Sequence, residues 1–294
     1  MQSKVILIDL SHGEMLTTNV DDEFSDFVKL LKNLNLKIIK NENKDLTRKL
    51  LETVDVLVLG NPIDDYFSNI EIKDIVNYVR IGGNLILVSE YGADFLQKTN
   101  LNELAANFGF FFEKNLIKEQ NSHNQNCSSI LHIQKFPSNE IVNGLREVII
   151  GGACSLFLKK GAKPLLQTSE NNIWSEIYNN TSEEWTKDKE QQHTIAAYSI
   201  FGQGKVIALG DIDIFSNDDN IGINSLDNYK FLQNIMVWLT ELVKRPDVMS
   251  FILDQMGELQ NGVKEIQNTI NNLIETISIL ERRITFLEEK TKSK

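Results

Sequence analysis

The segment VILIDLSHGEM (residues 5–15) begins as an apolar, β-branched run and ends as a cluster of polar side chains. A short run of this composition is typical of a strand that is buried on both faces of a parallel sheet. Asp9 ends the run, and Ser11, His12 and Glu14 follow closely. Ligands of open parallel sheets bind beyond the carboxyl ends of the strands. The segment therefore predicts the first strand of an α/β domain and, just after it, part of a candidate site.

Apolar runs and helical patterns continue to alternate along the first third of the chain. Ser68 and Glu71 have the spacing of a capping box at the start of a helix, and Gly82 is placed to end that helix. Strands and helices in this order form right-handed crossovers, which predicts a mostly parallel sheet with helices on both faces. We expect strands at residues 5–10, 36–39, 54–60 and 84–89, and helices at residues 24–34 and 46–51 and between Ser68 and Gly82.

The middle of the chain is less regular. The polar residues 114–134 indicate a loop or a hairpin, and residues 147–201 indicate short strands joined by turns. Residues 169–192 interrupt that pattern with a long polar stretch, which predicts a mobile surface loop. Regular structure returns in residues 193–211, where we expect two strands that turn at paired glycines.

An amphipathic helix at residues 228–243 closes the first domain, which we place at residues 1–245, and Pro246 breaks the chain. Beyond it, apolar residues recur at alternating spacings of three and four. A sustained heptad with β-branched residues at a and Leu at d predicts a long coiled-coil helix, at residues 247–292, that pairs in parallel with a second copy. The alternative is a helix that packs on its own domain, which would need only an irregular stripe of apolar residues with a period of 3.6. The expected oligomerisation residues are Val263, Ile266, Ile270, Leu273, Ile277, Leu280, Ile284 and Leu287.

Composition and charge exclude some classes of partner. The chain has a formal net charge of −11, whereas a surface that tracks phosphates needs clustered Lys and Arg. We therefore expect neither nucleic acid nor an anionic membrane as a partner. The only cysteines are Cys127 and Cys154, and no leader or membrane span is evident. We expect reduced thiols, no membrane insertion and a cytoplasmic location.

Polar side chains recur where several predicted strands end. A single His after a strand is more often a structural hydrogen-bonding group than a catalyst, but recurrence at several strand ends makes a ligand pocket an equally good interpretation. The chain contains no phosphate-loop, dinucleotide or HExxH motif, and the segment from Asp211 lacks the Gly and Glu of a calcium loop, so we expect no metal and no cofactor. The pocket candidates are Ser11, His12, Asn61, Glu90, Tyr91, Asp211, Asp213 and Asn217.

The segments IDLSHGEM, GGNLILVSEYG and GQGKVIALGDIDIFSNDDN, followed by NIMVWL, resemble the class I glutamine amidotransferase-like superfold. More closely, residues 1–245 are similar to its divergent branch, the GIFT-type domain of the gliding-motility ABC-transporter accessory protein and the 52-kDa intraflagellar-transport subunit. The resemblance implies an amidotransferase-like, flavodoxin-like α/β fold. Catalytic members of the superfold carry a cysteine at the turn after the fourth strand, with a His and a Glu from a late loop. Here that turn carries Ser89 and Glu90, Cys154 lies in another segment, and no His follows His193.

The missing triad implies a non-catalytic binding or assembly module, a scaffold or adaptor without glutaminase activity. We expect it to oligomerise through its coiled coil with a second copy or a related subunit, and to present a pocket that could take a small molecule. Two other interpretations stay open. One is a small-molecule hydrolase that uses His12, Glu90 and either Ser11 or Asp211. The other is a sugar- or nucleotide-binding sensor that signals through the coiled coil.

Overall fold

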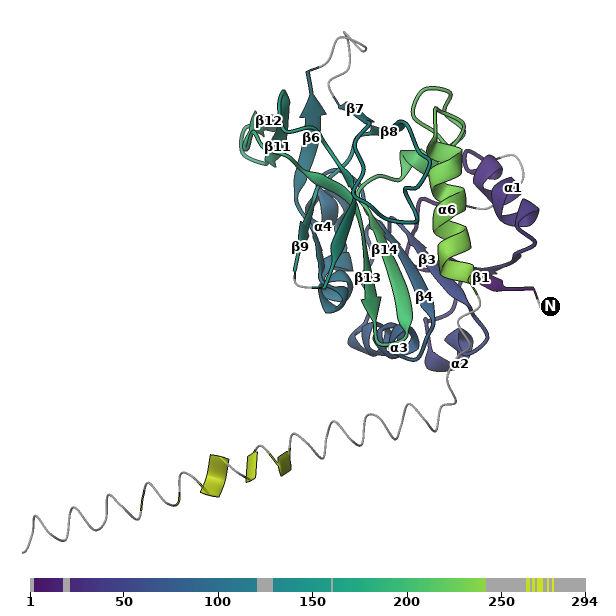
Figure 1. The fold of residues 1–294 in the computed structure, drawn as a ribbon, viewed down its shortest axis with the longest axis vertical. Coiled ribbons are helices and arrows are strands. Elements are labelled where there is room, and N and C mark those ends of the chain that lie inside the picture. The colour runs from purple at the N-terminus through teal and green to yellow at the C-terminus, as the bar shows by residue number, and fades with distance from the viewer. Residues whose placement is uncertain are drawn as a thin grey trace, which may run out of the picture. The chain divides into compact units, whose positions relative to one another are not determined.

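A computed structural model describes residues 3–17, 22–120, 129–159 and 161–241, and positions 263, 264, 266, 267, 269–271, 274 and 277. Seven strands form the central sheet: β1 (Val5–Asp9), β2 (Lys37–Asn41), β3 (Val56–Gly60), β4 (Asn84–Val88), β10 (Lys163–Gln167), β13 (Thr194–Phe201) and β14 (Gly204–Leu209). Their order across the sheet is β10-β13-β14-β4-β3-β1-β2, and Figure 1 labels β13, β14, β4, β3 and β1 among them.

Parallel pairing joins five of these strands, from β2 through β1, β3 and β4 to β14. β13 and β10 extend the sheet in antiparallel fashion. The apolar runs lie in the middle of the sheet, where both faces are covered, and Ile6, Leu7 and Ile8 have no exposed surface. The prediction of a central, largely parallel sheet is therefore confirmed.

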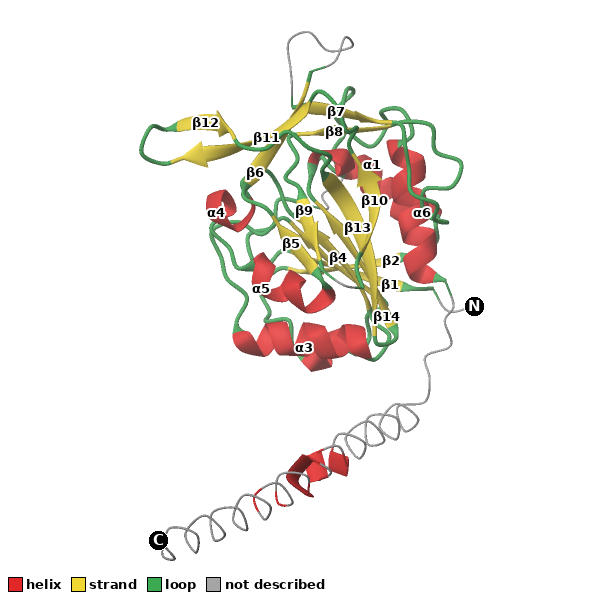
Figure 2. Ribbon diagram, turned by 60° about the vertical axis from the view of Figure 1, so that its left-hand side comes forward, coloured by secondary structure: helices red, strands yellow, loops and turns green. Residues whose placement is uncertain are grey.

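Helices cover both faces of this sheet. α1 (Ser25–Asn33) and α6 (Asn228–Thr240) lie on one face, and α3 (Asn69–Arg80) and α5 (Leu101–Ala105) lie on the other (Figure 2). Because side chains alternate along a strand, Ile6 of β1 packs in the same core as Phe27 of α1, whereas Leu7 packs in the same core as Ile75 of α3. The connections contain α2 (Arg48–Leu51), α4 (Ala93–Gln97) and two 3-10 turns, η1 (Ala106–Phe108) and η2 (Asp213–Phe215).

α3 begins with the capping box that its sequence predicts. The Ser68 hydroxyl accepts a hydrogen bond from the Glu71 amide at 3.2 Å, and the Glu71 carboxylate accepts one from the Ser68 amide at 2.9 Å. The helix is followed by Gly82, whose φ of +106° suits a residue without Cβ. The box fixes the Glu71 carboxylate at the start of α3, where it also meets the loop after β1.

Two expectations for the middle of the chain are wrong. Residues 169–192 contain a hairpin of β11 (Ile173–Asn179) and β12 (Glu184–Lys187), not a loop, and β11 also pairs with β6 (Asn115–Glu119). The described parts of residues 114–134 do not pair as one hairpin, because β6 pairs with β11 while β7 (Ile130–Ile133) pairs with β8 (Val148–Gly151). The alternation of apolar and polar residues that marks a strand is weak in β12, because most of this strand faces solvent and most of its residues are polar. A last small sheet pairs β5 (Phe110–Phe112) with β9 (Leu156–Leu158).

The chain divides into two compact units, Met1–Val243 and Lys244–Lys294. In the second unit every described position is helical and exposed. Pro246 and four of the eight oligomerisation residues (Leu273, Leu280, Ile284 and Leu287) lie outside the described residues, so the coiled coil and the domains at residues 1–245 and 247–292 stay predictions. None of the helices in the described part of the chain is long and apolar enough to span a bilayer.

Candidate functional site at the carboxyl ends of the strands

The polar residues that follow the central strands form two clusters of ionisable groups. We call the first the histidine cluster; it consists of Asp9, His12, Glu14, Asn41 and Glu71. The Ser11 hydroxyl contacts this cluster through Asp9. We call the second the acidic cluster; it consists of Glu90, Asp211 and Asp213. Three of the eight pocket candidates, Asn61, Tyr91 and Asn217, belong to neither cluster.

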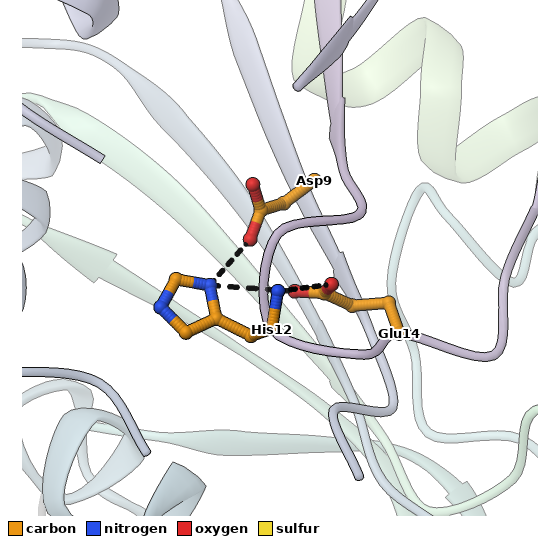
Figure 3. Close-up of side chains that lie close together, drawn as sticks. All are labelled: Asp9, His12 and Glu14. Carbon is orange, nitrogen blue, oxygen red and sulfur yellow. Dashed lines mark hydrogen bonds and ion pairs between the residues drawn. The ribbon is translucent and has the colours of Figure 1, made fainter. Parts of the chain in front are cut away.

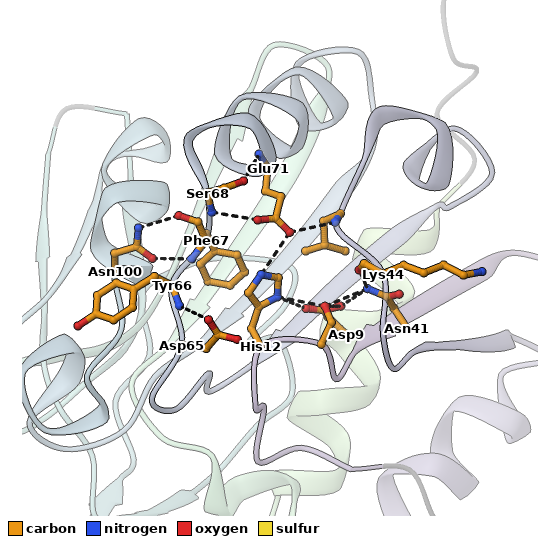
Figure 4. Close-up of polar contacts among 12 residues, drawn as sticks. Asp9, His12, Asn41, Lys44, Asp65, Tyr66, Phe67, Ser68, Glu71 and Asn100 are labelled. Atoms are coloured by element: carbon orange, nitrogen blue, oxygen red, sulfur yellow. Dashed lines mark hydrogen bonds and ion pairs between the residues drawn. The ribbon is translucent and has the colours of Figure 1, made fainter.

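His12 is buried, and each of its ring nitrogens lies close to a carboxylate oxygen. Its Nδ1 lies 2.7 Å from Oδ2 of Asp9, and its Nε2 lies 3.2 Å from Oε1 of Glu71 (Figure 4). Burial lowers the pKa of His12, but the hydrogen bond and charge of Asp9, with the charges of Glu14 and Glu71, outweigh it and raise the pKa to about 9. At neutral pH the ring is therefore an imidazolium that donates a hydrogen bond to Asp9 and forms an ion pair with Glu71.

Asp9 has no exposed surface and anchors one side of this ring. Its Oδ1 accepts hydrogen bonds from the Ser11 hydroxyl at 2.9 Å and from Nδ2 of Asn41 at 2.6 Å, which leaves Oδ2 for His12. Burial raises the pKa of Asp9, but its contacts with His12, Glu14 and Asn41 outweigh burial and lower it. Asn41 is available for this contact because it is the direct neighbour of Asp9 in the pairing of β2 with β1.

Glu14 has a fully buried side chain and lies near the same ring nitrogen of His12 as Asp9 does (Figure 3). Its Oε2 accepts a hydrogen bond from the His12 amide at 2.9 Å. Its Oε1 lies 3.8 Å from Nδ1 of His12 and has no hydrogen-bond partner among the described residues. Burial raises the pKa of Glu14 to about 8, and the neighbouring carboxylate of Asp9 acts in the same direction. The Glu14 carboxyl therefore carries a proton at neutral pH.

Glu71 connects His12 to two other segments. Besides the bond from the Ser68 amide, its carboxylate accepts a hydrogen bond from the Leu46 amide at 3.1 Å. Burial raises the pKa of Glu71, but these backbone hydrogen bonds and the charge of His12 outweigh it and lower the pKa. The ring of Phe67 lies 4.2 Å from the imidazole, centroid to centroid, and shields it (Figure 4). One imidazolium thus fastens the loop after β1 to the start of α3.

The acidic cluster consists of three carboxyls without a described basic partner. Both oxygens of Glu90 accept backbone hydrogen bonds, from Tyr91 and Ile212, and both oxygens of Asp211 accept them from Asp213 and Ile214. Burial, followed by the charges of Asp211 and Asp213, raises the pKa of Glu90 well above its ordinary value. Burial and the charge of Asp213 do the same for Asp211. Burial, with the charges of Glu23 and Asp218, raises the pKa of Asp213 to about 6.

Cys154 comes from another segment but lies beside the turn at Ser89 and Glu90. It is completely buried, and its amide donates to the Gly210 carbonyl at 2.9 Å. Burial and the charge of Glu90 raise the pKa of the thiol well above its ordinary value, against the opposing hydrogen bond with Ser89. A buried thiol that keeps its proton is a poor nucleophile.

The other three pocket candidates have different local contacts. Asn61, at φ +58°, bonds to Met15 through its carbonyl oxygen and its side-chain amide. Tyr91 is 41% exposed, and its ring contacts that of Trp185 edge-on at 6.0 Å. Asn217 bonds to the start of α1, accepting from the Asp26 amide and donating to the Ser25 hydroxyl. Asn217 thus holds a helix in place.

Sequence reasoning missed four members of the histidine cluster: Asp9, Glu14, Asn41 and Glu71. Asp9 and Glu14 flank His12 in one segment, so their proximity could have been inferred. Glu71 was explained completely by its capping box, and Asn41 ends a strand without any distinguishing pattern. Their contacts with the loop after β1 depend on how β2 and α3 are placed against it.

Comparison with known proteins places this geometry in a class. Residues 5–124 match the family model described as the IFT52 GIFT domain. The structure is similar to the mmIFT52 N-terminal domain, with a TM-score of 0.66 and 18% sequence identity over 81% of this chain and 98% of that chain. It is also similar to a putative ThuA-like protein from Bacteroides uniformis, with a TM-score of 0.52 and 12% identity over 82% and 93% of the two chains. A cytoplasmic protein from Salmonella typhimurium has a TM-score of 0.51 and 15% identity over 80% and 98%. No curated protein sequence matches the chain.

These matches show that the chain has an α/β fold shared with the mmIFT52 N-terminal domain and with a ThuA-like protein. Residues 5–124 match the GIFT-domain model, and the chain shares the fold of the mmIFT52 N-terminal domain. The resemblance drawn from the sequence is confirmed at the level of the fold.

Proposed function

We propose that this chain is a non-catalytic binding or assembly module of the intraflagellar-transport type, a scaffold or adaptor that resides in the cytoplasm. The observation that carries the proposal is the state of the turn after β4. Where catalytic members of the superfold carry a cysteine, this turn carries Ser89 and Glu90, and the Glu90 carboxylate binds backbone amides of its own domain. The nearby thiol of Cys154 is buried and protonated, which removes it as a substitute nucleophile.

The geometry of His12 also argues against the alternative of a small-molecule hydrolase. A general base needs a ring nitrogen that can take a proton from substrate or water. Both ring nitrogens of His12 face carboxylates, and its pKa of about 9 keeps the ring protonated at neutral pH. His12 therefore acts as a cross-link within the domain. We expect the polar residues at the strand ends to serve as the docking surface for a partner or a small ligand.

The second part of the proposal is self-association through the C-terminal helix. Val263, Ile266, Ile270 and Ile277 occupy a and d positions of the heptad, and they are between 49% and 62% exposed. Exposed aliphatic side chains at this spacing favour pairing with another helix, and β-branched residues at a favour two parallel strands. The partner is a second copy of the chain or a related subunit.

Two measurements on the full chain test this function. Ammonia release from glutamine should stay at the level of the buffer blank for the wild type and for Cys154→Ala. Steady release that disappears in Cys154→Ala would overturn the non-catalytic assignment. Self-association is tested by sedimentation equilibrium, as set out in the Discussion.

A further inference from the structure

Three side chains of one short segment converge on a single point of the histidine cluster. Asp9, His12 and Glu14 each offer one metal-ligand atom, and these atoms all lie within 4.8 Å of one another. The turn that brings them together depends on Gly13, which has a φ of +66°. A Cβ at this position would lie 2.6 Å from the Ile63 carbonyl oxygen, so the loop is held against the neighbouring segment.

One atom of this arrangement lacks a partner. Oε1 of Glu14 is buried and has no hydrogen-bond partner in the described part of the chain, although Oε2 accepts from the His12 amide. The orphan oxygen faces Nδ1 of His12 at 3.8 Å (Figure 3). A buried carboxyl oxygen without a partner is costly as a carboxylate, which is why Glu14 holds a proton at neutral pH. A cation placed between Glu14 and Asp9 would satisfy the same oxygen in place of that proton.

The surrounding groups are those that orient metal ligands in proteins. A histidine that binds a metal through one nitrogen usually donates its other N–H to a carboxylate, which fixes the ring. Here Nε2 of His12 faces Oε1 of Glu71, which the Leu46 amide also holds. On the opposite side, Asn41 and Ser11 occupy Oδ1 of Asp9 and leave Oδ2 directed at His12 (Figure 4).

We propose that the histidine cluster binds one divalent transition-metal ion, with Zn²⁺ as the preferred ion, through Oδ2 of Asp9, Nδ1 of His12 and Oε1 of Glu14. Binding replaces the Nδ1 proton of His12 and the carboxyl proton of Glu14, and both protons pass to solvent. The separation of Nδ1 from Oδ2, now 2.7 Å, widens to about 3.3 Å, as two ligands at about 2.0 Å in a tetrahedron require. An imidazole nitrogen with two carboxylate oxygens selects Zn²⁺ over Mg²⁺ and Ca²⁺, which prefer oxygen alone.

The acidic cluster is the natural internal comparison. Glu90, Asp211 and Asp213 also lie within ligand distance of one another, but both oxygens of Glu90 and of Asp211 already accept backbone hydrogen bonds. It also lacks an imidazole. The structure assigns the ion to the histidine cluster, and a variant of the acidic cluster serves as a matched control.

The test uses the full chain without an affinity tag, stripped of metal with a chelator. Zn²⁺ binding is measured by equilibrium dialysis with elemental analysis and by calorimetry, in the presence of millimolar Mg²⁺. We expect about one Zn²⁺ per chain. Glu14→Gln should weaken the affinity at least tenfold, and Glu71→Gln, which removes only the orienting carboxylate, should weaken it about 10–100-fold. Asp213→Asn should bind as the wild type does, and circular dichroism confirms that each variant is folded.

A second measurement needs no variant. The X-ray absorption fine structure of the zinc-loaded wild type should show nitrogen and oxygen ligands that include one imidazole. Three results would overturn the proposal: less than about 0.1 Zn²⁺ per folded chain, a zinc shell without imidazole, or unchanged affinity in folded Glu14→Gln. Loss of binding in Asp213→Asn would also overturn it, because that result places the ion in the acidic cluster.

Discussion

Nε2 of His12 lies 3.2 Å from Oε1 of Glu71, so the loop after the first strand is tied to the capping box of α3. Glu71 therefore has two roles, one local and one long-range. Its carboxylate caps the first turn of its own helix. The same carboxylate pairs with Nε2 of the buried His12 imidazolium, whose Nδ1 is bonded to Asp9. The histidine cluster is a cross-link between segments that are distant in the chain.

Replacement of His12 should destabilise the domain strongly. His12→Ala leaves the carboxylates of Asp9 and Glu71 buried without their shared cation, and loss of one partner from a buried ion pair costs about 3–5 kcal/mol. The free energy of unfolding in urea measures the loss. His132→Ala is the control, because its pair with Glu147 is more exposed and should contribute about 1 kcal/mol or less. Equal losses in the two variants would show that the buried pairs do not carry the stability we assign to them.

Addition of a methyl group at Gly13 should also destabilise the domain. Gly13→Ala combines a positive φ of +66° with a Cβ placed 2.6 Å from the Ile63 carbonyl oxygen. Backbone strain of this kind costs about 1–3 kcal/mol, and the clash adds to it. Gly161→Ala is a matched control, since its φ is +103° and nothing lies within 4 Å of the added Cβ. A melting temperature lowered equally by both substitutions would remove the clash from the explanation.

Asp213 should make stability fall as pH rises. Its pKa is raised from the ordinary 3.8 to about 6, so the folded state holds the proton more tightly than the unfolded chain does. Ionisation of Asp213 in the folded state lowers the stability of the domain. This destabilisation is absent below about pH 4, grows between about pH 4 and pH 6, and is complete above that. We expect Asp213→Asn to match the wild type at pH 4 and to exceed its stability above pH 6 by about 1 kcal/mol, after allowance for solvent screening.

Asp26 provides a control of opposite sign for this pH dependence. Hydrogen bonds from Lys29 and Asn224 lower its pKa below the ordinary 3.8. The stability that ionised Asp26 contributes is therefore present above about pH 4 and is lost as the pH falls further. Asp26→Asn should therefore be less stable than the wild type at neutral pH and equal to it in acid. Urea unfolding at a series of pH values checks both variants. A stability gain in Asp213→Asn that is independent of pH would contradict the titration argument.

Charges in the heptad seam should abolish self-association. Ile270→Asp with Ile277→Asp places two carboxylates at a positions, where a dry interface cannot solvate them. Sedimentation equilibrium should give a dimer for the wild type and a monomer for the double variant. Lys264→Asp with Asn271→Asp, at exposed b positions, should remain dimeric. A wild type that stays monomeric well above micromolar concentration would leave only a related subunit as the partner.

The sequence by itself determined the features that depend on neighbouring residues. The apolar run before Asp9 identified β1 because a strand buried on both faces needs an unbroken run of apolar side chains. Ser68 and Glu71 identified the start of α3 because a capping box is closed within four residues. The missing cysteine at Ser89 and Glu90 could also be seen directly. Local patterns of this kind are sufficient for the strand and helix order of the first third of the chain and for the absence of a cysteine at the turn after β4.

Only the tertiary structure decided how these elements meet. The hairpin of β11 and β12 was missed because its polar strands are specified by pairing with β6, which lies elsewhere in the chain. The partners of His12 depend on the placement of β2 and α3 against the loop after β1, which brings Asn41 and Glu71 to the same imidazole. Long-range contacts of this kind leave no periodic signal, because a single hydrogen bond constrains two residues and nothing between them.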